Sequence, residues 1–242
     1  MYHQFMAIPD VLAFIRSELE KRATREHREG LCRYFKEPVD PYGVRAADVK
    51  KVEQQAARIV RKWPVADRNR LCGELMKSGR LEESTIVVYL YARFAKQCAG
   101  CEFKLFERWI DRYTGNWATC DGIASKLVAA SIANDPSLIA QLTAWTGSKN
   151  RWKRRAAAVC LTWEARKGRH TAQILALAAR LMLDDDEMVQ KGTGWLLKET
   201  YPPRPAETMD FLLRWNDRAP RLTLRYAAEK MTASDRAKVL GR

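Results

Sequence analysis

Apolar residues recur along most of the chain at the spacing of a helix face. The segment VLAFIRSELEKRA places Val11, Leu12, Ile15 and Leu19 on one stripe. Apolar positions three and four residues apart predict amphipathic α-helices. No stretch alternates convincingly between apolar and polar residues, so the pattern predicts an all-α fold. A second clear stripe, in TAQILALAARLML, consists of Ile174, Leu175, Ala178, Leu181 and Met182.

One apolar segment is ambiguous between helix and strand. IVVYLYARF at 86–94 is rich in β-branched and aromatic residues, but its apolar run continues into ARFAKQCAG, which favours a buried helix. Helix breakers elsewhere divide the chain into roughly a dozen helices of ~10–17 residues. These breakers are PVDPYG at 38–43, Trp63-Pro64, Asp135-Pro136, GSKN at 147–150, Lys167-Gly168 and YPPRP at 201–205.

A weak internal repeat runs through the second half of the chain. Lys191 follows Arg155 by 36 residues, Arg225 follows Lys191 by 34, and small residues come after each. Counting 34 residues back from Arg155 reaches Asp121, again with small residues after it. This period suits a helix pair with two short turns. We therefore predict one domain over 1–242, an α-solenoid of HEAT-like repeats whose concave basic groove presents these four positions in a row.

The charge balance favours a polyanionic partner. Lys and Arg number 43 against 29 Asp and Glu, which gives a formal charge of +14. Nucleic acid is the first expectation, ahead of a membrane surface or an acidic protein. The apolar fraction of 47% and the eight Trp argue against disorder.

Basic residues concentrate on the predicted row. A groove that follows a nucleic-acid backbone needs cations at repeated spacing along a concave surface, which a solenoid provides. The alternative is that these are solvated helix faces and that Arg155 forms a structural ion pair with Asp121. For the row as a whole, the net charge favours nucleic acid. The candidates are Arg151, Lys153, Arg154 and Arg155, followed by Lys191, Lys198, Arg221 and Arg225.

Three tryptophans share helix faces with members of the row. Trp117 precedes Asp121 by four residues, Trp152 precedes Arg155 by three, and Trp195 follows Lys191 by four. Aromatic rings among cations can stack on bases or pack on sugars. Core packing is the alternative for any one of them. It is also the role that we expect of Trp109, Trp145, Trp163 and Trp215.

Asp121 is the exception in a row of cations. A surface that binds a polyanion should exclude negative charge unless the charge has a task, and stabilising a developing cation is one. Cleavage of a glycosidic bond passes through an oxocarbenium-like state. A lone carboxylate suits a substrate whose leaving group needs no protonation, such as a purine already cationic through alkylation of a ring nitrogen. The alternatives are a helix-start residue and a partner for Arg155.

Other chemistry has little support. Cys98 and Cys101 form a CxxC, but no second CxxC or HxxxH accompanies it, so we predict no metal and reduced thiols. The acidic run at 184–187 is most simply an N-cap with favourable dipole charge. Neither a secretory leader nor a run of ~18 apolar residues is visible. We expect a soluble cytoplasmic protein.

With these residues in place, the chain resembles the AlkD family of HEAT-like DNA glycosylases. GNWATCD resembles the family's Trp-x-x-x-Asp element, NRWKRRAAA its Trp-x-x-Arg-Ala-Ala element, and VQKGTGWLLKE its Gln-Lys-x-x-Gly-Trp element. LCRYFKEPVDPYGV resembles a segment with Tyr before a Gly-containing turn, which suggests Tyr34. The similarity covers about residues 30–230. Cys120 beside Asp121 and a poorly matching middle are departures that bear on lesion preference.

The resemblance implies removal of N3- and N7-alkylated purines from duplex DNA without flipping the base into a pocket. It implies that Asp121 stabilises the oxocarbenium while Trp117 and Trp195 pack on the sugar. It also implies that Arg155 grips a phosphate near the lesion. Further DNA contacts would come from Lys191, Arg225, Trp152, Gln190, Tyr34 and Arg154.

We therefore predict a monomeric alkylpurine DNA glycosylase that needs no metal or cofactor. Its partner would be double-stranded DNA containing alkylated bases. We expect no interaction with a membrane. One alternative is a non-catalytic HEAT-like module that binds damaged or unusual DNA. Another is a scaffold whose basic face meets acidic proteins. Asp121 separates the first two, since a pure DNA binder gains nothing from a carboxylate there.

Overall fold

The structure, a computed structural model, describes residues 6–94 and 100–241. Within these ranges the chain forms helices and no strand, and an isolated β-bridge joins Asp40 to Arg80. The all-α prediction is therefore confirmed. The chain divides into two compact units, residues 1–95 with 112–119 and residues 96–111 with 120–242. The extent of the domain, set at 1–242 from the sequence, stays a prediction.

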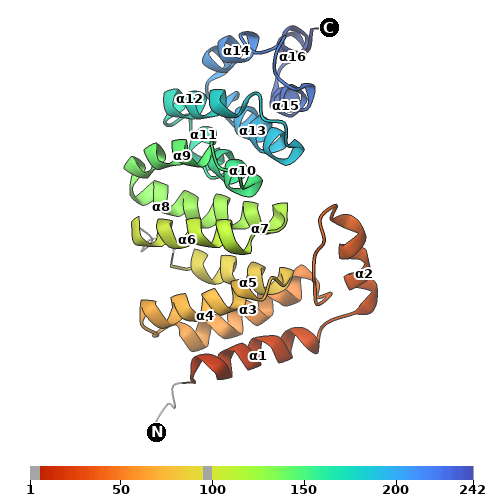
Figure 1. The fold of residues 1–242 in the computed structure, drawn as a ribbon, viewed down its shortest axis with the longest axis vertical. Helices are drawn as coiled ribbons and strands as arrows, with labels where there is room; N and C mark the ends of the chain where they lie inside the picture. The colour runs from red at the N-terminus through yellow and green to blue at the C-terminus, as the bar shows by residue number, and fades with distance from the viewer. Residues whose placement is uncertain (1–5, 95–99, 242) are drawn as a thin grey trace. The chain divides into compact units, whose positions relative to one another are not determined.

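The first unit is built around an N-terminal stack of helices (Figure 1). Val11, Ile15 and Leu19 are fully buried on the first of them, as their spacing predicts, and Leu12 lies at the edge of the stripe. The segment at 86–94 is helical as far as Ala92. The helices are α1 (Ile8–Glu20), α2 (Arg25–Tyr34), α3 (Ala46–Val60), α4 (Val65–Lys77) and α5 (Leu81–Ala92).

A buried carboxylate anchors the connection between α2 and α3. Glu82 accepts hydrogen bonds from the backbone N–H groups of Tyr42, Gly43 and Val44 at 2.9, 2.8 and 3.0 Å. Gly43 adopts a φ of +94°, and a side chain there would overlap the carbonyl oxygen of Thr24. The PVDPYG breaker is therefore an ordered connection, bound by Glu82 of α5 and packed against Thr24 at the start of α2.

The second unit continues with shorter helices. Three of its segments depart from α geometry: η2 is a π-helix, while η3 and η4 are 3₁₀-helices. The boundaries between the units fall within α6 (Gly100–Tyr113) and α7 (Trp117–Gly122). The remaining elements are η2 (Ile123–Val128), α8 (Ala129–Asn134), η3 (Pro136–Gln141), α9 (Leu142–Trp145), α10 (Arg151–Val159), α11 (Thr162–Arg166), α12 (Thr171–Leu181), α13 (Glu187–Thr200), α14 (Pro205–Leu213), α15 (Arg221–Ala227), η4 (Ala228–Lys230) and α16 (Ala233–Leu240).

Small residues let the repeated helices of the second unit approach closely. Helix α13 packs against α10 on one side and against α15 on the other. A Cβ atom on Gly192 would lie 3.1 Å from Cγ of Arg155, and one on Gly194 would lie 2.7 Å from the carbonyl oxygen of Thr223. The small residues that mark the repeat are thus the points of closest contact between its helices.

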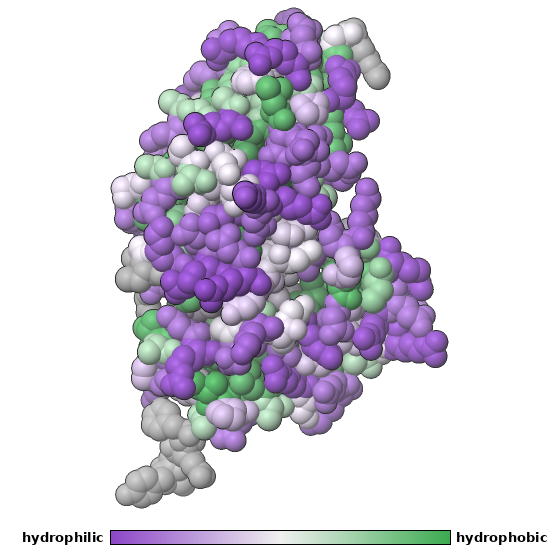
Figure 2. Space-filling model, in the orientation of Figure 1, coloured by the Kyte–Doolittle hydropathy of each residue, from purple (hydrophilic) through white to green (hydrophobic). Residues whose placement is uncertain are grey.

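Hydrophilic side chains cover most of the visible face of the molecule, and hydrophobic ones show only in small patches (Figure 2). Among the described residues, no helix is both long and apolar enough to cross a membrane.

Candidate nucleic-acid interface

Asp121 and Arg155 form a two-pronged ion pair in the second unit. Nε and Nη2 of Arg155 donate to Oδ1 and Oδ2 of Asp121, both at 2.7 Å. The side chain of Asp121 is 16% exposed and that of Arg155 is 7% exposed. The planar guanidinium matches the carboxylate, so the pair fixes the plane of both groups. The pairing considered as an alternative from the 34-residue spacing is therefore present.

The rest of the Arg155 guanidinium is also held inside the protein. Its Nη1 donates to the carbonyl oxygen of Met188 at the start of α13. Burial alone would lower the pKa of Arg155, but the hydrogen bonds and charge of Asp121 raise it above its ordinary value. Arg155 is thus a permanent buried cation. Its observed task is to hold Asp121, which differs from the phosphate contact that the resemblance implies.

The helix that carries Asp121 changes geometry just beyond it. Helix α7 ends at Gly122, and the next six residues, Ile123–Val128, form a π-helix. The Ser125 hydroxyl donates to the carbonyl oxygen of Asp121 at 2.6 Å. Single π-turns within helices occur frequently at functional sites. No sequence signal marked this one.

The later members of the row remain more accessible. Lys191 on α13 is partly exposed and pairs only loosely with Glu187, at 3.6 Å. Arg225 on α15 is exposed. Lys198, a further candidate, donates to Glu229 at 2.7 Å. Lys191 and Arg225 therefore keep charge available for a phosphate, whereas Asp121 and Arg155 satisfy each other.

Trp195 is partly exposed on α13, and its polar atom is bound. Its indole N–H donates to Oε1 of Glu199 at 3.2 Å. Glu199 is 3% exposed, and its Oε2 accepts from Arg166 and Lys230 at 3.0 and 2.6 Å. Glu199 is not among the site residues predicted from the sequence. The signal was there, because a carboxylate four residues after Trp195 shares its helix face.

The first unit brings Tyr34 and Trp117 together. Their ring centroids lie 6.0 Å apart in an edge-on arrangement, although 83 residues separate them in the chain (117 − 34). Phe35 stacks on Trp117 at 5.3 Å and is itself buried. Tyr34 is 68% exposed. The result is an aromatic cluster with an exposed rim, of the kind that packs on sugars or bases.

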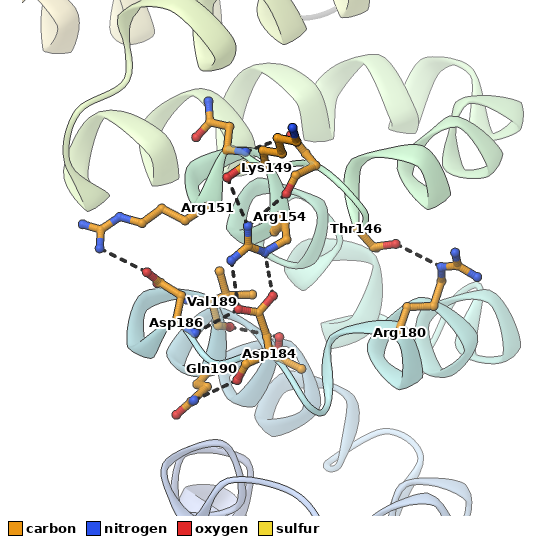
Figure 3. Close-up of polar contacts among 12 residues, drawn as sticks. Thr146, Lys149, Arg151, Arg154, Arg180, Asp184, Asp186, Val189 and Gln190 are labelled. Carbon is orange, nitrogen blue, oxygen red and sulfur yellow. Dashed lines mark hydrogen bonds and ion pairs between the residues drawn. The ribbon is translucent and has the colours of Figure 1, made fainter.

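The acidic run holds two residues that we predicted to contact DNA (Figure 3). Nε and Nη2 of Arg154 donate to Asp184 at 2.6 and 3.1 Å, and its Nη1 donates to the Ser148 carbonyl oxygen. Nε2 of Gln190 donates to the Asp184 carbonyl oxygen at 2.8 Å. Arg154 and Gln190 therefore both donate to Asp184 within the fold, and their contacts with DNA stay a prediction.

Asp186 confirms the N-cap prediction for the acidic run. It accepts from the backbone N–H groups of Met188 and Val189 at the start of α13, at 2.8 and 3.2 Å. It also accepts from Arg151 on α10. The run thus joins α10 to α13 in addition to capping α13.

Two tryptophans lie where we did not expect them. Trp152 is buried, its carbonyl oxygen accepts from the Cys120 thiol, and the guanidinium of Arg151 covers its ring at 4.4 Å. Trp152 therefore belongs to the core and not to the DNA contacts. Trp163 was expected in the core but is half exposed. Trp109 and Trp145 are buried as expected.

Cysteine and metal chemistry find little support in the described part of the chain. It contains no group of three or more His, Cys, Asp or Glu side chains able to hold a metal. Cys98 of the CxxC lies outside the described residues. Cys120 is fully buried beside Asp121, and burial raises the pKa of its thiol well above the ordinary value. Its thiol is therefore an inert neighbour of the carboxylate.

We expect the stability contributed by Glu199 to depend on pH. Burial alone would raise the pKa of Glu199, but hydrogen bonds from Arg166 and Lys230 lower it to about 2 from 4.5. A carboxyl with a lowered pKa stabilises the fold above its unfolded pKa and loses that contribution as pH falls towards the folded one. Glu199→Gln should lower the free energy of unfolding by about 2 kcal/mol at pH 7.

Urea unfolding of wild type and Glu199→Gln at pH 7, 4 and 3 measures this effect. The difference between the two proteins should shrink below pH 4.5, the range in which the unfolded carboxyl takes up its proton. A difference that stays constant down to pH 3 would contradict the ion pairs.

Fold and site together define a class of protein. It is an all-helical protein with a high net positive charge. Its second unit has accessible cations on α13 and α15 and a carboxylate, Asp121, that an arginine binds. The family profile described as DNA alkylation repair enzyme matches residues 15–231. The chain therefore belongs to the DNA alkylation repair enzyme family, whose work is the repair of alkylation damage in DNA.

One solved structure is similar in fold. It is described as a predicted DNA alkylation repair enzyme from Enterococcus faecalis. The TM-score is 0.76 at 15% identity, and the match covers 88% of this chain and 98% of the other. No curated protein matches the sequence.

Proposed function

We propose that this protein is a DNA glycosylase that excises cationic alkylpurines, N3-alkyladenine and N7-alkylguanine, from duplex DNA. The observation that carries the proposal is Asp121, a partly exposed carboxylate that Arg155 binds and that the sequence spacing groups with Lys191 and Arg225. Family membership supports the repair of alkylated DNA. The reaction and the lesions are our inference from the charge of this site.

The chemistry needs only one carboxylate. A purine alkylated at N3 or N7 carries positive charge, so it leaves as a neutral base without being protonated. The bond from C1′ to nitrogen breaks, and the deoxyribose becomes an oxocarbenium cation. Asp121 would stabilise this cation electrostatically and orient a water molecule towards C1′. The water oxygen then bonds to C1′ and its proton passes to solvent, which leaves an abasic site.

The arginine clamp gives Asp121 a defined orientation. Each carboxylate oxygen has two lone-pair directions, and Arg155 uses one on each. The other directions remain for a water molecule or a sugar cation. Because the plane of the carboxylate is set before substrate binds, little reorganisation is needed during the reaction. In this proposal Arg155 acts through Asp121.

Aromatic rings would complete the surroundings of the sugar. Trp195 is partly exposed in the second unit, and Trp117 carries the aromatic cluster of the first. The face of an indole attracts positive charge, and we propose that Trp195 packs on deoxyribose at the lesion. The same role for Trp117 stays an expectation from the family resemblance. A base that is already a good leaving group need not enter a pocket, so excision would proceed without base flipping into the protein.

Arg225 should contribute one phosphate contact. It is exposed on α15 and follows Lys191 by 34 residues in the sequence. Arg225→Ala should weaken binding to any duplex sequence and reduce the slope of log affinity against log salt by about 1. Fluorescence anisotropy with a labelled duplex at several salt concentrations measures both quantities. Lys238→Ala, on α16 and outside the row, is the control and should leave the slope unchanged.

A second candidate function has one observation in its favour. The pair between Asp121 and Arg155 satisfies both charges within the stack. A non-catalytic module that binds damaged or unusual DNA would need no more than that. In this case Lys191 and Arg225 bind the phosphate backbone of DNA, while the ion pair of Asp121 with Arg155 only joins α7 to α10.

Base release from methylated duplex DNA tests the proposal. The protein is incubated with duplex treated with a methylating agent, and free 3-methyladenine and 7-methylguanine are measured by chromatography. We expect release well above the buffer control. Steeply salt-dependent binding without release would replace the proposal with the non-catalytic module, and weak binding without salt dependence would favour a scaffold for acidic proteins. The cytoplasmic location and the monomeric state stay predictions.

A further inference from the structure

In the described part of the second unit, Glu199 accepts the hydrogen bond of the indole N–H of Trp195. The two residues lie one turn apart on α13, and the indole N–H donates to Oε1 at 3.2 Å. Trp has a single hydrogen-bonding atom, so this contact fixes the rotation of the ring as well as its position. Trp195 stays partly exposed, which leaves ring surface available to a ligand.

Two cations on neighbouring helices hold Glu199 in turn. Arg166 on α11 and Lys230 on η4 both donate to Oε2, at 3.0 and 2.6 Å. These cations are about half exposed, whereas the carboxylate is nearly fully buried. Oε2 therefore faces the two cations, and Oε1 faces the tryptophan. Burying a carboxylate destabilises the fold unless the carboxylate is fully paired. Here two cations and the indole N–H all donate hydrogen bonds to it.

An anionic acceptor changes the ring that it binds. A carboxylate on the indole N–H pushes electron density into the π system, because hydrogen-bonded groups polarise one another where water is excluded. The ring face then attracts a cation more strongly. A neutral acceptor at the same position would hold the ring in place without this effect.

We propose that Glu199 is a positioning residue for Trp195: it orients the indole and strengthens the attraction of its face for the positively charged sugar formed during base release. The inference rests on the proposed glycosylase function. The contrary reading is that Glu199 only joins α11, α13 and η4, and that Trp195 is an incidental neighbour.

A double-mutant cycle distinguishes these readings. Glu199→Gln keeps the shape and an acceptor but removes the charge, and Trp195→Phe keeps an aromatic ring but removes the N–H donor. We expect Glu199→Gln to slow single-turnover base release about tenfold in the wild-type background. In the Trp195→Phe background, the same change should slow it less than twofold. Equal effects in both backgrounds would show that Glu199 does not act through Trp195.

The indole N–H resonance of Trp195 gives a readout that does not need catalysis. The resonance is assigned by its absence in Trp195→Phe. We expect Glu199→Gln to move it upfield, since the amide is a weaker acceptor than the carboxylate. Glu229→Gln is the matched control, the same chemical change at a residue that pairs with Lys198, and should leave the resonance in place. An unmoved resonance in Glu199→Gln overturns the proposal.

The two experiments also separate the failure of this inference from that of the proposed function. If wild type releases no base, the glycosylase and the positioning role of Glu199 in base release both fall, and the resonance then reports only the contact. If wild type releases base and the resonance moves, but the cycle shows no coupling, the glycosylase stands and the positioning role is wrong.

Discussion

Asp121→Asn should slow base release from methylated duplex by about 100- to 1,000-fold, the usual cost of removing one preorganised electrostatic group. Asn has the shape of Asp and can still accept a hydrogen bond from Arg155. It carries no charge to stabilise the sugar cation. Single-turnover chromatography of released 7-methylguanine, with enzyme in excess, measures the rate of the chemical step.

Folding has to be controlled in this experiment, because the change also weakens a buried ion pair. Loss of charge at Asp121 should cost about 2 kcal/mol of unfolding free energy, since Arg155 remains buried. Asp121→Asn combined with Arg155→Met removes the uncompensated cation and should unfold closer to wild type. It should remain as slow as Asp121→Asn, because the missing group is the carboxylate.

Asp111→Asn is the matched control for the same chemical change. Asp111 lies on α6, is partly exposed and pairs with Lys153. It should release base at the wild-type rate. If Asp121→Asn is also as fast as wild type, the mechanism proposed for Asp121 is wrong, whatever its effect on stability.

Gly194→Ala should destabilise the second unit by about 3 kcal/mol, the upper part of the range for overpacking. A Cβ at this position would lie 2.5 Å from Cβ of Tyr226 and 2.7 Å from the carbonyl oxygen of Thr223. Both are rigid parts of α15, so neither can rotate away. The helices α13 and α15 would have to separate. Calorimetry or thermal melting followed by circular dichroism should show a melting temperature lower by about 6–12 °C.

Gly73→Ala provides the comparison. Gly73 lies within α4, and a Cβ there meets nothing within 4 Å. Alanine is the better helix former, so this variant should be more stable than wild type by about 0.5–1 kcal/mol. If Gly194→Ala has the same melting temperature as wild type, α13 and α15 do not approach as closely as described.

Most of the helices could be predicted because their signal is local. Burial of Val11, Ile15 and Leu19 follows from the spacing of apolar residues on one face. The same holds for α12, where Ile174 and Leu181 are fully buried. The π-helix at Ile123–Val128 escaped prediction, since no residue type marks it.

The candidate site was predicted in part. The spacing of Asp121 and Arg155 correctly anticipated their contact, because a 34-residue period places equivalent positions of neighbouring repeats side by side. Exposure could not be predicted in the same way. Arg154 and Trp152 have the residue types of a DNA-binding surface, yet the first is bound to Asp184 and the second is buried.

The sequence by itself determined the all-helical architecture, and it predicts a repeat and a row that contains Asp121, because each depends on periods that recur along the chain. Only the tertiary structure decided how each charged side chain is used. The partners of Glu199 lie 33 residues before it and 31 after it, on other helices. The packing of those helices decides which cations form ion pairs inside the protein and which remain available to DNA. Periodicity alone does not specify that packing.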